Sequence, residues 1–316
     1  MRTRRNRRSR RPSNLLAATR ISEVQSDGTA RLDQSSRAGS PVHWTAKRYR
    51  GLSIGSGFDH RRFDGTVQSV FARALNIQLE GDRLVALVAS DLPNAPATIR
   101  AKFDGVEMSQ IAVPGDVVAC RAGLLRLGSG AAIDLRSARR WKPEAPSGRP
   151  NREAWRALYR FAAAVPAFGE LTGWLGLEMC GNPGRFADRP GSWLTATLEP
   201  LAGRGPGLTP AGDDFIAGLA VALYWSGNAA LLAQPLTGWA THTTDVSRWL
   251  LLDSISGRIN APICEAAAFL HGEPPGCRPD AALKLGHTSG PAMILGLLAG
   301  YAFAWPNLVS DAKAAT

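Results

Sequence analysis

The sequence predicts an α+β protein, with an N-terminal, mainly antiparallel β domain followed by a helical C-terminal domain. Short β-prone runs crowd the stretch from Gly65 to about Leu135, whereas apolar residues recur at helical spacing after Asn151. Residues 141–150 carry three prolines and separate the two patterns as a linker. We therefore expect a basic, disordered arm at 1–60, a β-rich domain at 61–145 and a helical domain at 146–316.

Two hairpins are predicted within the β domain. The runs 75–79 and 84–88 flank a short turn that contains Gly81, and the runs 117–127 and 131–135 flank Gly128-Ser129-Gly130. Several short strands at close spacing are typical of a small antiparallel sheet or a partial barrel.

Helical spacing predicts further helices at about 213–225, 245–256, 261–270 and 291–303. The apolar runs Phe215–Trp225 and Pro291–Trp305 carry apolar residues almost all round. Both are shorter than the roughly 20 residues that cross a bilayer. We therefore expect two buried core helices and no membrane partner.

The basic charge of the chain is concentrated at its start. Seven arginines within residues 2–11 carry most of the formal net charge of +11 and leave +4 for the remainder. No aromatic residue interleaves them to stack on bases, so we do not expect a nucleic-acid partner. The apolar run Leu15–Ala18 is too short to be the hydrophobic region of an export signal peptide. We therefore expect a cytoplasmic protein. The four cysteines lack zinc-ligand spacing and are predicted to be free thiols.

A glycine-rich loop precedes the first apolar helix, at residues 203–214. Its glycines, among them Gly205, Gly207 and Gly212, would let a ligand approach the backbone closely. Thr209 followed by Pro210 predicts a helix start, with threonine as the N-cap and proline first in the helix. The helix dipole and Arg204 favour a bound anion such as phosphate or a carboxylate.

Asp213 and Asp214 would repel an anion placed beside them. In one interpretation a carboxylate holds Mg²⁺ between itself and a phosphate, which makes both residues candidate metal ligands. In a second, a carboxylate accepts hydrogen bonds from a carbamoyl group or from backbone amides that shape the loop. In a third, both are ordinary acids of a helix N-terminus.

A second loop, residues 286–291, repeats the pattern before the second apolar helix. Thr288 and Ser289 could cap that helix or bind a ligand together with Gly290, and Pro291 would be its first residue. His287 is either a proton-transfer group or a structural histidine. Two buried helices that begin in this way predict a shared pocket.

Between the two loops, Thr244 is predicted to be an N-cap, and the hydroxyls of Thr244 and Ser247 could also reach the pocket.

The segment Gly207–Phe215, Gly-Leu-Thr-Pro-Ala-Gly-Asp-Asp-Phe, resembles the signature of a family that includes the AllH-like subunit of oxamate carbamoyltransferase. Residues 286–290 and the pattern Thr243-Thr244-x-x-Ser247 are similar to other parts of that family's sequence.

The resemblance implies a transferase subunit of allantoin-type purine catabolism, in which oxalurate and phosphate exchange with oxamate and carbamoyl phosphate. Its implied companions are an acyl-CoA-synthetase-like protein and another subunit, in a hetero-oligomer. In that setting Arg204 would hold the anion, Thr209, Thr288 and Ser289 would stabilise an oxyanion, and His287, Asp213 or Asp214 would move the proton. The alternative is a non-catalytic assembly or regulatory subunit that binds a small carboxylate or nucleotide.

Overall fold

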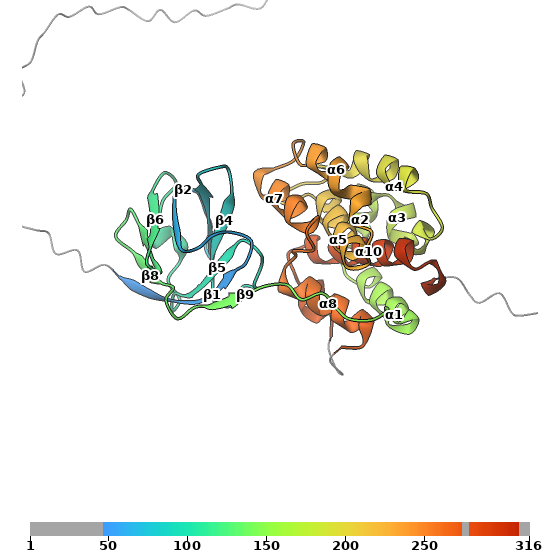
Figure 1. The fold of residues 1–316 in the computed structure, drawn as a ribbon, viewed down its shortest axis with the longest axis horizontal. Helices are drawn as coiled ribbons and strands as arrows, with labels where there is room; N and C mark the ends of the chain where they lie inside the picture. The colour runs from blue at the N-terminus through green and yellow to red at the C-terminus, as the bar shows by residue number, and fades with distance from the viewer. Residues whose placement is uncertain (1–46, 274–277, 310–316) are drawn as a thin grey trace, which may run out of the picture. The chain divides into compact units, whose positions relative to one another are not determined.

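The computed structural model describes residues 47–273 and 278–309. The arginine-rich segment and Cys277 lie outside these ranges. The described residues form nine strands followed by ten α-helices, so the predicted α+β class is confirmed (Figure 1). No helix within the described ranges is both long enough and apolar enough to span a membrane.

The strands form one closed barrel with a short extension. They are β1 (Arg48–Gly55), β2 (Arg62–Val70), β3 (Ala74–Leu79), β4 (Leu84–Ala89), β5 (Thr98–Lys102), β6 (Val117–Arg121), β7 (Leu124–Leu127), β8 (Ala132–Asp134) and β9 (Arg139–Trp141). Their order is β5-β4-β3-β2-β6-β7-β8-β1, and β1 pairs antiparallel with β5 to close the ring. Most neighbours are antiparallel, whereas β4–β5 and β1–β8 are parallel. Closure leaves the eight barrel strands without a free edge.

The two predicted hairpins are present, and one prediction about them is corrected. β3 and β4 pair around the turn at Gly81, and β7 and β8 pair around residues 128–130. The run 117–127, however, is two antiparallel strands, because Ala122 and Gly123 both have positive φ and reverse the chain. Residues 48–55 of the predicted arm form β1, in which buried Tyr49 lies between the exposed Arg48 and Arg50 and the strand ends in buried residues that include Ile54. The polar composition of the surrounding segment hides this strand in the sequence.

The β4 sequence, Leu-Val-Ala-Leu-Val-Ala, is apolar throughout because both faces of the strand are covered. Val85 and Leu87 point into the barrel core. The opposite face carries Leu84 and Ala86, which lie opposite helix α7 (Asp245–Ser254). The barrel therefore has one outer face that is not exposed to solvent.

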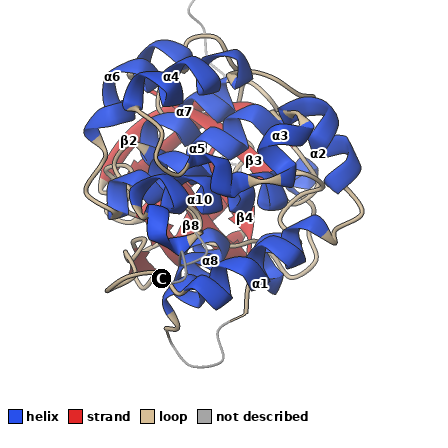
Figure 2. Cartoon of the chain, turned by 90° about the vertical axis from the view of Figure 1, so that its right-hand side faces the viewer, coloured by secondary structure: helices blue, strands red, loops and turns tan. Residues whose placement is uncertain are grey.

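The helical domain contains two helices at its centre and eight around them (Figure 2). The central pair is α5 (Ala211–Trp225) and α10 (Ser289–Ala304), whose residues are almost all buried. The others are α1 (Arg152–Ala163), α2 (Phe168–Leu175), α3 (Leu177–Gly181), α4 (Gly191–Leu198), α6 (Ala230–Trp239), α7, α8 (Ala261–His271) and α9 (Asp280–Leu283). The predicted helices are confirmed with small shifts of their ends, and α2, α3, α4, α6 and α9 are additional.

Candidate functional site

The two central helices run side by side in the same direction, with their N-termini together. A Cβ atom added to Gly218 of α5 would lie 2.0 Å from the carbonyl oxygen of Met293, and one added to Gly296 of α10 would lie 1.9 Å from that of Phe215. Glycine is therefore required at both positions for the backbones to approach this closely. Two helix dipoles with their positive ends adjacent create a place that favours negative charge.

The N-termini are joined by a hydrogen bond between hydroxyls that are far apart in the sequence. Thr209 Oγ1 and Ser289 Oγ lie 3.0 Å apart. The sequence predicted that both residues belong to one site, and the structure brings them together. The predicted N-cap at Thr209 is wrong, because the N-cap position of α5 is Pro210, which provides no side-chain cap. Of the two roles left open for Ser289, capping is not observed, since the N-cap position of α10 is Thr288 and no side chain caps the helix. The hydroxyls of Thr209 and Ser289 bond to each other instead.

The predicted helix starts at the two prolines are also corrected. α5 begins at Ala211, one residue after Pro210, and Pro291 is the third residue of α10. The loops fold back onto the first turns, because Gly212 N–H donates to Arg204 O at 2.9 Å and Gly290 N–H donates to Leu285 O at 2.8 Å. One amide of each first turn is therefore used by the protein itself.

The loop before α5 is held in place by Asp213. Its carboxylate accepts a hydrogen bond from Gly203 N–H at 2.8 Å and another from the Thr243 hydroxyl. Gly203, Gly205 and Gly207 all have positive φ, as the tight course of the loop requires. Of the interpretations open for Asp213, its contacts match a carboxylate that shapes the loop.

Asp214 is in a different environment from its neighbour. It is completely buried, and neither of its carboxylate oxygens has a hydrogen-bond partner among the described residues. Burial raises the pKa of the Asp214 carboxyl well above its ordinary value, and the charge of Asp213 raises it further. The Ser289 and Thr209 hydroxyls lie close enough to the carboxyl to favour its ionised form, although neither makes a hydrogen bond of good geometry to it, and burial has the larger effect. A buried carboxyl without partners is costly and needs a functional explanation.

The start of α7 packs against the same loop. Thr244 is the N-cap of α7, as predicted, and its Oγ1 accepts from Ser247 N–H at 3.1 Å. The Thr244 hydroxyl also donates to Leu208 O. Ser247 is fully buried, and within the described ranges its hydroxyl has no hydrogen-bond partner. Thr243 and Thr244 thus connect α7 to the loop that carries Asp213.

Arg204 and His287 lie at the surface. No ion pair to the Arg204 guanidinium is found in the described part of the chain, and the residue is exposed. His287 Nε2 lies 2.8 Å from Glu170 Oε1, and the His287 side chain is 67% exposed. His287 also lines a surface cavity of about 420 Å³ together with Phe161 and Lys284. The structure therefore divides the predicted site into a group at the helix N-termini, buried Asp214 with the partly buried Thr209 and Ser289, and two exposed residues.

In residues 47–273 and 278–309, no group of three or more His, Cys, Asp or Glu is placed to hold a metal ion. Cys120, Cys180 and Cys264 are free cysteines, and burial raises the pKa of the Cys180 and Cys264 thiols to about 12. These buried thiols are poor nucleophiles.

The fold and this site define a class of protein, in which a closed β-barrel precedes a helical domain built around two parallel helices with joined N-termini. Residues 50–140 match the AllH family N-terminal domain, and residues 201–301 match the family described as oxamate carbamoyltransferase subunit AllH. The chain belongs to the AllH family. The second match contains both glycine-rich loops. No solved structure matches the chain.

Sequence reasoning missed two sets of polar residues. One is Glu170, the partner of His287, which lies on a helix that the sequence pattern did not predict. The other is a cluster in which Arg83 of the barrel and Arg258 both bind the buried carboxylate of Asp253 on α7. Its members are separated by up to about 170 residues, so no local spacing could have revealed the cluster.

Proposed function

We propose that this chain is a subunit of an oxamate carbamoyltransferase and that the joined N-termini of α5 and α10 bind the substrate's anionic group. The observation that carries the proposal is the Thr209–Ser289 contact beside the fully buried, unpartnered carboxyl of Asp214. The membership of the chain in a family described as a subunit of that enzyme supports the choice of reaction.

Asp214 acts in this proposal as a neutral acid. Because burial raises its pKa, the carboxyl keeps its proton where an exposed aspartate would be ionised. A neutral carboxyl does not repel an anion at the helix N-termini and can donate a hydrogen bond to it. This removes the conflict between two adjacent aspartates and a bound anion, since the charge of Asp213 is engaged by Gly203 and Thr243.

The proposed chemistry follows from these roles. A phosphate oxygen attacks the carbamoyl carbon of oxalurate, and the carbonyl oxygen becomes an oxyanion. The hydroxyls of Thr209 and Ser289 stabilise this oxyanion together with the helix dipoles. When the tetrahedral intermediate collapses, the bond from carbon to the oxamate nitrogen breaks, and Asp214 supplies the proton that this nitrogen takes. The attacking hydrogen phosphate loses its own proton to Asp214, which restores the neutral acid. Carbamoyl phosphate and oxamate leave.

The companion subunits would complete the site from the exposed side. Arg204 is exposed at the loop and would contact the outer oxygens of the phosphate that the joined N-termini bind, once a companion subunit covers them. This assignment explains why an arginine expected to bind an anion lies at the surface of the isolated chain.

The reaction is tested in the enzyme assembled with its companion subunits. We expect Ser289→Ala to reduce carbamoyl transfer by about 10²-fold, as for the loss of one oxyanion donor. Ser256→Ala is the matched control, because Ser256 is an exposed serine elsewhere in the chain. Equal activity of both variants would refute a catalytic role for the joined N-termini and favour a non-catalytic assembly or regulatory subunit.

A further inference from the structure

A second cavity lies between the outer face of the barrel and α7, away from the joined N-termini. Its volume is about 150 Å³, and its lining is mainly apolar. Strand β4 contributes Leu84 and Ala86, and α7 contributes Trp249 and Leu250. A cavity of this size holds a molecule about as large as benzene.

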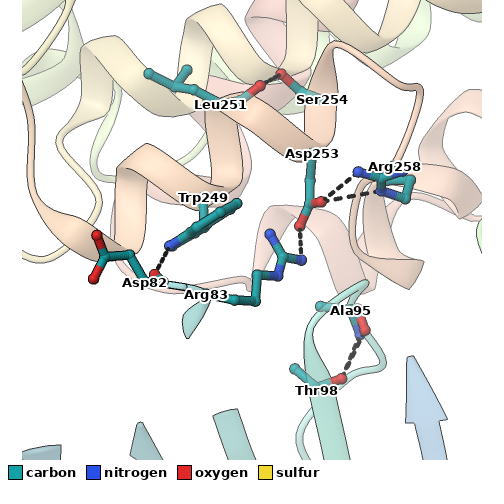
Figure 3. Close-up of polar contacts among 9 residues, drawn as sticks. All are labelled: Asp82, Arg83, Ala95, Thr98, Trp249, Leu251, Asp253, Ser254 and Arg258. Atoms are coloured by element: carbon teal, nitrogen blue, oxygen red, sulfur yellow. Dashed lines mark hydrogen bonds and ion pairs between the residues drawn. The ribbon is translucent and has the colours of Figure 1, made fainter. Parts of the chain in front are cut away.

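Asp253 and Arg258 line one side of the cavity, and Arg83 binds the same Asp253 carboxylate from outside the lining (Figure 3). The Asp253 carboxylate, only 6% exposed, accepts from Arg83 at 2.7 Å and from Arg258 at 3.0 and 3.1 Å. The Arg83 guanidinium lies 4.5 Å from the centre of the Trp249 ring, whose indole N–H donates to Asp82 O at 2.7 Å. The exposed Asp82 side chain turns away from Arg83 in Figure 3.

The cluster carries one unbalanced positive charge, since two arginines share one aspartate. Arg83 and Asp253 are 13% and 6% exposed and Arg258 is 38% exposed, so this charge is only partly solvated, which is costly. In addition, Arg83 Nε is buried and has no hydrogen-bond acceptor within the described residues. The cluster can therefore accept one further negative charge, and Arg258 is the arginine through which the cavity reaches it.

We propose that this cavity binds a small aromatic carboxylate. The ring lies among Leu84, Ala86 and Trp249, and the carboxylate faces Arg258, the arginine that lines the cavity. The apolar lining and the volume select one planar ring, and the charge of the cluster selects a monoanion. This ligand site is independent of the carbamoyl-transfer proposal, because none of the residues that carry it belongs to the joined N-termini.

Benzoate is the probe that tests the site, with benzamide as its neutral counterpart. Calorimetry on the full-length chain should show benzoate binding with a Kd of about 1 mM. Arg258→Gln should weaken benzoate binding by about 10-fold or more and leave benzamide unchanged. Arg258 is suited to this test because its side chain is 38% exposed, so its replacement leaves the core packing in place.

Steric filling provides a second test. Ala86→Leu places a larger side chain in the cavity and should abolish benzoate binding. Ala281→Leu is the control for added bulk, because Ala281 is an exposed residue of α9. Equal affinity for benzoate and benzamide would overturn the proposal. Unchanged benzoate binding in Ala86→Leu, or no binding to the wild-type chain, would overturn it as well.

Discussion

Asp214→Asn is expected to reduce carbamoyl transfer by about 10³-fold, a typical loss for a group that donates or accepts a proton in the transition state. Asparagine has nearly the shape of the neutral acid and can still donate a hydrogen bond, but it has no proton to transfer. The measurement is turnover of the assembled enzyme. His287→Ala is the comparison, because His287 is exposed and paired with Glu170. A larger loss in His287→Ala than in Asp214→Asn would assign the proton transfer to the histidine.

The same variant also tests the protonation state of Asp214 without any activity assay. An unfolded aspartate ionises near pH 4, whereas the folded carboxyl has a raised pKa and keeps its proton. Between these two pKa values, unfolding releases a proton, so the wild-type chain loses stability as the pH rises. Asparagine has no such dependence. The stability of Asp214→Asn relative to wild type should therefore rise above about pH 4, by about 1.4 kcal/mol per pH unit.

Urea denaturation at a series of pH values measures this difference. The stability of Asp214→Asn relative to wild type should rise until the pH reaches the pKa of Asp214 in the folded chain, and should then level off. A stability difference that stays constant over the whole series would show that Asp214 ionises normally in the folded chain. This result would contradict the proposal that Asp214 is a neutral acid.

Gly296→Ala is expected to destabilise the chain by about 3 kcal/mol or more, at the upper end of the cost of overpacking. The new Cβ would lie 1.9 Å from Phe215 O, and this backbone atom cannot move unless α5 and α10 separate. Separation would also pull Thr209 away from Ser289 and open the joined N-termini. The midpoint of urea denaturation reports the change.

The matched control is Gly173→Ala in helix α2, where no atom lies within 4 Å of the added Cβ. There the substitution should increase stability by up to about 1 kcal/mol, because alanine is the better helix former. If Gly296→Ala and Gly173→Ala had the same effect, the close approach of α5 and α10 would not be needed for the fold.

The fold was largely predictable because this sequence shows two strong patterns: short β-prone runs separated by turn residues, and apolar residues at helical spacing. The hairpin of β3 and β4 and the apolar helices α5 and α10 follow from residue patterns within single segments. Closure of the barrel was not predictable, since it depends on the pairing of β1 with β5, whose residues are about 50 positions apart. The short helices α3 and α9 lack enough turns to show a period.

The site was predictable only in its local parts. The sequence indicated that the loops before α5 and α10 belong together, and the contact between Thr209 and Ser289 agrees with this. It could not indicate that Asp213 is engaged by the loop while Asp214 has no partner. Two adjacent residues in a helix point about 100° apart, so their surroundings depend on packing that the sequence pattern does not contain.

Anion binding by the purified chain can be measured directly, by calorimetric titration with inorganic phosphate. We expect the wild-type chain to bind phosphate and the double variant Thr209→Val/Ser289→Ala to bind it at least about 10-fold more weakly, because both hydroxyl donors are lost. Phosphate affinity that is the same in both proteins would contradict anion binding at the joined N-termini of α5 and α10.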